Sequence, residues 1–117
     1  MSFPTRNPNL LGTVNIGSMP SGYGTVTTPT HSAPTAGVAS GVILAANANR
    51  LYALFVNDSD TVVYLAFGVA AVVNTGVRLN ANGGWYEMSV GLGNIYRGEI
   101  RGISGIAGKV VLVTEGV

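Results

Sequence analysis

Short apolar runs separated by turn residues occupy the chain from residue 38 to residue 117. The runs are rich in Val, Ile, Leu and Tyr, and the breaks between them hold Gly, Asn and Asp, which adopt turn conformations that strand residues avoid. We predict strands over residues 38–46, 51–56, 61–67, 85–90, 94–103 and 109–115, with a further short strand over 77–79. Six to seven short strands without helices between them predict an all-β fold, an antiparallel β-sandwich or barrel.

The N-terminal third of the chain has a different pattern. Residues 1–37 hold all five prolines and a Thr-rich run over 25–30, and they show neither a helical nor a strand-like apolar period. Only Arg6 and His31 carry side-chain charge there. We interpret residues 1–37 as an extended N-terminal arm and residues 38–117 as the β-sandwich body. An arm with so little charge is expected to lie along another protein surface.

The faces of the predicted strands differ in polarity. Strands 51–56 and 61–67 are apolar on both faces, so each is expected to have a covered outer face or to belong to a subunit interface. Strand 94–103 instead places Arg97, Glu99 and Arg101 on one face. This row is either a solvated ladder of alternating charges or an inter-subunit contact.

Composition excludes several classes of protein. Only 9% of the 117 residues are charged, against about 25% in ordinary domains, and 47% are apolar, so the chain is not a disordered tail. The net charge is +1 and the cations are scattered, which argues against nucleic-acid binding. The longest uncharged apolar stretch, 61–77, is interrupted by polar residues and glycines, and the first twenty residues do not resemble a secretory signal. A body of this size is marginally stable alone, which favours oligomerisation.

The inventory of reactive side chains is small. The chain has no cysteine and one histidine, His31, which has nothing near it in sequence that would orient it as a base, and no serine lies in a Gly-x-Ser-x-Gly motif. Residues 57–60 resemble the start of a calcium loop but lack its glycine and distal glutamate, and we interpret them as a hairpin turn held by side-chain-to-backbone hydrogen bonds. The glycine-rich stretch 102–109 lacks P-loop spacing. We therefore expect no catalytic residues, no cofactor and no metal site.

Four strings carry a resemblance to a known family: Asn47-Ala48-Asn49-Arg50, residues 63–68, residues 76–79 and residues 83–87. Together they are similar to a pattern in head decoration (cement) proteins of tailed bacteriophages, over roughly residues 40–115. The resemblance implies a β-sandwich or barrel body, assembly into homotrimers and attachment to the outside of an icosahedral capsid. It also implies the major capsid protein as partner, no enzymatic activity, and a location on the virion surface after synthesis in the host cytoplasm.

Two groups of residues are expected to form the contacts of such a protein. In the arm, the predicted capsid-attachment residues are Phe3, Arg6, Leu10 and Tyr23. In the body, the predicted subunit-interface residues are Tyr52, Leu54, Tyr64, Arg97, Glu99 and Arg101. The main alternative is a tail or baseplate receptor-binding module that recognises carbohydrate through Trp85 and neighbouring tyrosines. An enzyme that uses an unrecognised carboxylate pair is the third alternative.

Overall fold

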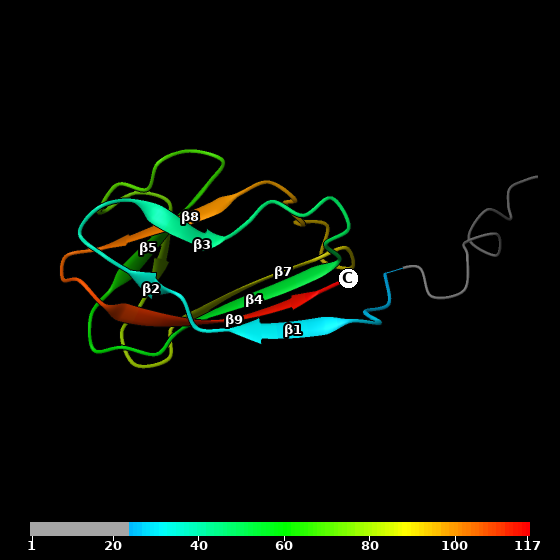
Figure 1. Cartoon of the computed structure of the whole chain (residues 1–117), viewed down its shortest axis with the longest axis horizontal. Coiled ribbons are helices and arrows are strands. Elements are labelled where there is room, and N and C mark those ends of the chain that lie inside the picture. The colour runs from blue at the N-terminus through cyan, green and yellow to red at the C-terminus, as the bar shows by residue number, and fades with distance from the viewer. Residues whose placement is uncertain (1–23) are drawn as a thin grey trace, which may run out of the picture.

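The computed structural model describes residues 24–117, which form two antiparallel sheets packed against each other (Figure 1). The strands are β1 (Pro29–Ser32), β2 (Thr35–Ala36), β3 (Gly41–Leu44), β4 (Tyr52–Asn57), β5 (Val63–Phe67), β6 (Val77–Leu79), β7 (Trp85–Ser89), β8 (Ile100–Ser104) and β9 (Lys109–Gly116). No helix occurs in the described part of the chain. The predicted all-β fold is confirmed, and the two separate sheets make it a sandwich rather than a barrel.

Strands that follow one another in sequence usually belong to different sheets. The first sheet has the order β1-β9-β4-β7, with β2 also paired to β9, and the second has the order β3-β8-β5-β6. Because β4 and β5 lie in different sheets, the segment between them crosses the sandwich and is not a hairpin. The hairpin predicted over residues 57–60 is therefore wrong, since turn chemistry alone does not reveal which sheet the next strand joins.

The core lies between the two sheets, and alternate side chains of the central strands point into it. In β4 the inward residues Ala53 and Phe55 are fully buried, while Tyr52, Leu54 and Val56 on the other face are half-buried. The largest buried apolar side chains are Phe55, Leu65, Leu79, Met88, Ile100, Val63, Val111 and Val113. This alternation is the two-residue period expected of strands with one covered face.

All seven predicted strands have counterparts, in β3–β9, but the structure adds two strands inside the segment interpreted as the arm. β1 pairs with β9 from Pro29↔Gly116 to Ser32↔Val113, and β2 pairs with β9 farther along. Figure 1 shows β1 lying along the outer side of β9. β1 is exposed along its length, so it has no apolar alternation for the sequence to reveal. Residues 1–23 lie outside the described residues, and for them the arm remains a prediction.

The predicted strand 94–103 is much shorter in the structure. Only Ile100–Ser104 forms a strand, and the residues before it make a loop around the fully buried Arg50. Arg50 Nη1 donates to the carbonyl oxygens of Tyr96 at 2.6 Å and Gly98 at 3.1 Å. These carbonyls bind a guanidinium instead of a neighbouring strand, so the row of alternating charges does not form on one strand face.

Candidate interaction surfaces

The described residues enclose no pocket, and they bring together no group of three acidic or histidine side chains that could hold a metal ion. His31 lies exposed on β1, with Nδ1 3.0 Å from the Thr114 hydroxyl. The candidate functional site in residues 24–117 is therefore sought on the surface. Exposed apolar side chains lie there on the outer face of the first sheet and in the loop between β5 and β6.

An apolar row crosses the outer face of the first sheet. Val56 of β4 lies directly opposite Trp85 of β7 on one side and Leu112 of β9 on the other. Directly opposed side chains of antiparallel strands lie about 5 Å apart, so the three side chains are neighbours. Trp85 is 64% exposed and Leu112 is 41% exposed. We call Val56, Trp85 and Leu112 the apolar stripe.

A more polar row lies beside the stripe on the same face. Leu54 is paired with Glu87 and Thr114, and the next residue on this face of β4, Tyr52, is paired with Ser89. The Tyr52 hydroxyl donates to Glu87 Oε2 at 2.6 Å. This hydrogen bond, together with burial and the negative charge of Glu87, raises the pKa of Tyr52 to about 12.

The loop between β5 and β6 exposes three further valines. Val69, Val72 and Val73 of this valine loop (residues 68–76) are exposed, while Ala71 between them is buried. The backbone N–H of Ala71 donates to Ser40 Oγ at 2.8 Å, which ties the loop to the segment before β3. An exposed apolar loop held in place is a second candidate contact surface.

Arg101 holds the same region together from β8. Its Nε donates to Ser40 Oγ at 2.9 Å and its Nη2 donates to the Ser40 carbonyl at 3.0 Å. Its Nη1 forms an ion pair with Glu99 at 2.9 Å. Because these bonds use the guanidinium within the chain, the structure gives Arg101 a role in supporting the valine loop.

The predicted subunit-interface residues do not form one surface. Tyr52 and Leu54 lie on the outer face of the first sheet, whereas Tyr64 and Arg101 lie on the outer face of the second, where Tyr64 donates to Asn74 Oδ1 at 2.8 Å. Arg97 is exposed in the loop before β8, and its Nε donates to the Arg50 carbonyl at 2.9 Å. A single contact cannot use all of these residues, because the sandwich separates its two outer faces.

The predicted attachment residues Phe3, Arg6, Leu10 and Tyr23 lie outside the described residues. In the sequence, Trp85 was a candidate for a carbohydrate site and Val56 belonged to a strand expected to be covered or to form a subunit interface, whereas Leu112 and the valine loop were not singled out. The stripe depends on which strands pair and in what register, and neither is visible in a single sequence. The valine loop carries a sequence signal, since all five residues between Gly68 and Asn74 are apolar in a segment with turn residues at both ends.

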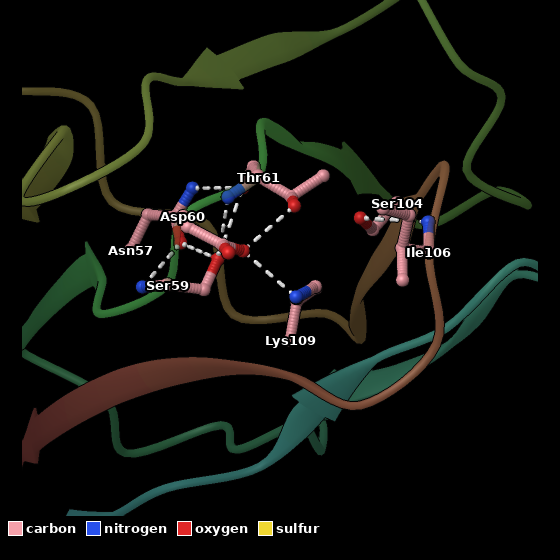
Figure 2. A network of polar contacts seen from close by, with 7 residues as sticks. All are labelled: Asn57, Ser59, Asp60, Thr61, Ser104, Ile106 and Lys109. Carbon is pink, nitrogen blue, oxygen red and sulfur yellow. Dashed lines mark hydrogen bonds and ion pairs between the residues drawn. The ribbon is translucent and has the colours of Figure 1, made fainter.

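The turn between β4 and β5 is held by side-chain hydrogen bonds (Figure 2). Asn57 Oδ1 accepts from the backbone N–H of Ser59 at 3.1 Å and from its hydroxyl at 2.7 Å, so side-chain-to-backbone bonding is confirmed here. Asp60 Oδ1 accepts from Lys109 Nζ at 2.7 Å and from the Thr61 hydroxyl. These two hydrogen bonds, with the charge of Lys109, lower the pKa of Asp60 below its usual value. The network joins the turn to the start of β9.

Comparisons with protein-family models, with curated proteins and with solved structures find no match to this chain. Nowhere in residues 24–117 does the chain form a helix with the length and apolar content needed to cross a membrane. The apolar stripe, the valine loop and the sequence resemblance are therefore the basis for a functional proposal.

Proposed function

We propose that this protein is a structural virion protein that binds the outside of an icosahedral phage capsid and stabilises contacts between major capsid subunits. The proposal assigns it no catalytic role. Its partners are the major capsid protein and further copies of itself in a homotrimer, and it reaches the capsid surface after synthesis in the host cytoplasm. The resemblance of residues 40–115 to phage decoration proteins supports this choice of partner.

The apolar stripe is the observation that carries the proposal. A tryptophan that is 64% exposed and in register with Val56 and Leu112 leaves a flat apolar row in contact with water. Covering such a row contributes about 25 cal/mol per Å² of apolar area, and exposed aromatic residues are common anchors of protein interfaces. Glu87, the one charged side chain in the paired rows around the stripe, already accepts the Tyr52 hydroxyl, so these rows favour a partner surface with few charges.

The arm remains the proposed attachment element, but the deletion that tests it should end before β1. Deletion of residues 1–36 removes β1 and β2 and also Ala36, which is 2% exposed in the core. A truncation that ends at residue 23 leaves every described strand in place. Loss of capsid binding after the shorter deletion is therefore attributable to the arm and not to damage of the sandwich.

Co-sedimentation with purified heads of the phage that encodes the chain tests the proposal. The full-length protein is expected to bind heads, and Trp85→Ala is expected to weaken binding about tenfold or more, as at an interface hot spot. Deletion of residues 1–23 is expected to abolish it. Leu92→Ala is the matched control, since Leu92 is 61% exposed but lies in the turn after β7, outside the stripe. Full-length protein that does not bind heads, or undiminished binding by both variants, contradicts the proposal.

The second candidate function is a tail or baseplate module that binds carbohydrate. The exposed ring of Trp85 beside the half-buried Glu87 and Tyr52 favours it, because sugars stack on aromatic faces and bond to carboxylates through their hydroxyls. Binding to a glycan array that is lost in Trp85→Ala, with no binding to heads, selects this alternative. The number of copies per virion separates the two candidates independently, because a capsid protein occurs in hundreds of copies and a tail component in few.

A further inference from the structure

Among the strands of residues 24–117, β7 ends the first sheet on one side (Figure 1). Half of its backbone N–H and C=O groups therefore face away from the other strands of the sheet. The carbonyl of Gly84 accepts from Asn57, and the N–H of Val90 donates to Leu51. Even-numbered positions of this segment therefore face β4, because backbone groups alternate sides along a strand. The backbone N–H and C=O groups that point away from β4 are those of Trp85, Glu87 and Ser89.

The side chain of Asn94 takes two of these outward groups. Its Oδ1 accepts from the backbone N–H of Ser89 at 2.9 Å, and its Nδ2 donates to the carbonyl of Glu87 at 3.0 Å. One amide thus supplies one donor and one acceptor, the same two groups that each residue of a neighbouring strand presents. The bonds lie at the two positions of β7 nearest to the turn that follows it.

The turn after β7 holds Asn94 in this position. The chain reverses through a turn in which Gly93 donates to the Val90 carbonyl at 3.1 Å, with Gly93 in the left-handed region at φ 75°. The Leu92 N–H donates to Ser89 Oγ at 2.9 Å. Asn94 Nδ2 also donates to the Tyr86 hydroxyl at 3.3 Å. The Ser89 N–H can only donate and the Glu87 carbonyl can only accept, so these two groups fix which end of the Asn94 amide carries the nitrogen.

The opposite end of the first sheet carries a second obstacle to strand addition. Thr28 and Val117 bond to each other through their backbone groups, so the even-numbered positions of β1 face β9 and Pro29 faces outward. Proline has no N–H to offer an incoming strand, and proteins use it at sheet edges to prevent unwanted pairing. Both edge strands of this sheet, β1 and β7, therefore offer an incoming strand only some of the backbone N–H and C=O groups that it would need for pairing.

We propose that Asn94 closes the free edge of β7 against strand addition by a second copy of this chain. β7 carries the exposed Trp85 at this edge, and burial of two such side chains would favour the pairing of two edges. With these two groups taken by Asn94, a second copy finds only part of the hydrogen-bonding row that it would need to extend the first sheet at β7. This inference does not depend on the proposed capsid function, because it concerns only the association of the chain with itself.

Analytical ultracentrifugation over a range of protein concentrations tests the inference. Asn94→Ala is expected to add an association that the unmodified protein lacks, so that the apparent mass about doubles at high concentration, as for edge-to-edge pairs. Asn94→Asp is expected to give a smaller increase, because it keeps the acceptor for Ser89 but loses the donor to Glu87. Asn49→Ala is the control, since Asn49 is exposed in a loop distant in sequence from β7.

A second substitution shows whether the new association uses this edge. The N–H of Glu87 faces away from β4, so Glu87→Pro removes a donor from the free edge and leaves the ladder to β4 intact. Adding Glu87→Pro to Asn94→Ala is expected to restore the mass of the unmodified protein. Three outcomes overturn the inference: an Asn94→Ala protein with unchanged mass, association that persists in the double variant, or a melting temperature that falls without any change in mass.

Discussion

Arg50 Nε donates to Glu115 Oε2 at 2.7 Å, and the Arg50 side chain is fully buried while that of Glu115 is 15% exposed. The two terminal nitrogens of the guanidinium donate to three backbone carbonyls, those of Ala45, Tyr96 and Gly98. One cation thus joins the loop after β3, the loop before β8 and the end of β9. A buried guanidinium is tolerated because a carboxylate and three carbonyls replace the water that it loses.

Arg50→Met is expected to lower the free energy of unfolding by about 3–5 kcal/mol, because it leaves the Glu115 carboxylate without its partner and frees three carbonyls. Urea denaturation with linear extrapolation measures the change. Arg78→Met is the control, since Arg78 is exposed and bonds only to the Asn80 side chain among the described residues, and its effect should stay within about 0.5 kcal/mol. A loss below about 1 kcal/mol for Arg50→Met contradicts the role given to this residue.

Alkaline pH is expected to weaken the fold through Tyr52. Its pKa is raised to about 12 in the folded state, against an ordinary value of 10.0. The unfolded chain therefore loses this proton first, and the contribution of Tyr52 to stability is complete below about pH 10 and declines as pH rises toward about 12. Tyr52→Phe should show a shallower fall in unfolding midpoint between these pH values. An equal slope in both proteins is the contrary result.

Tyrosinate absorbance gives an independent measurement of the same group. In the folded protein, Tyr52 is expected to give a late phase of tyrosinate absorbance near pH 12, and this late phase should vanish in Tyr52→Phe. Glu87→Gln should move the late phase to lower pH, because it removes the negative charge and replaces the carboxylate acceptor of the Tyr52 hydroxyl.

Gly84→Ala is expected to destabilise the protein by about 1–3 kcal/mol, because a Cβ at this position would overlap the backbone of Asn80. The same turn holds the hydrogen bonds from Gly84 to Asn80 and from Asn57 to Gly84, which the displacement would strain. Gly105→Ala is the matched control, since a Cβ there meets nothing within 4 Å. Thermal denaturation of both variants checks the difference, and equal melting temperatures would falsify the steric argument.

Deletion of residues 1–36 is expected to cost several kcal/mol of stability, because each of the lost backbone hydrogen bonds from β1 and β2 to β9 contributes about 1 kcal/mol. It also uncovers the edge of β9 and should promote association. Deletion of residues 1–23 should leave the melting temperature close to that of the full chain. Circular dichroism and ultracentrifugation distinguish the two, and equal stability after both deletions would show that β1 and β2 contribute little.

The strand pattern was readable in the sequence where one face of a strand is covered. The alternation of the buried Met88 with the half-buried Glu87 results from local burial and appears in a single chain, whereas β4 was recognisable as a short apolar run between turn residues. The pattern failed at β1, where all four residues are exposed, and at residues 94–99, where apolar and charged residues alternate without a partner strand. In both places the deciding contact is with a residue far away in sequence, Gly116 for Pro29 and Arg50 for Tyr96.

The candidate surfaces depended more heavily on tertiary structure than the strands did. Trp85, Val56 and Leu112 are separated in sequence by 26 residues or more, and only the pairing of β7 with β4 and of β4 with β9 makes them one stripe. Tyr52 and Tyr64 have similar neighbours in sequence, yet they lie on opposite outer faces because β4 and β5 joined different sheets.

The sequence by itself determined the class of fold, since alternating apolar runs with turn residues between them can bury their side chains only as strands. It also determined the scarcity of charge and of reactive groups. The tertiary structure decided which strands pair, that β1 and β2 complete the first sheet, that Arg50 is buried and that Asn94 closes an edge. These features arise from hydrogen bonds and packing between residues far apart along the chain, and local propensity carries no information about such partners.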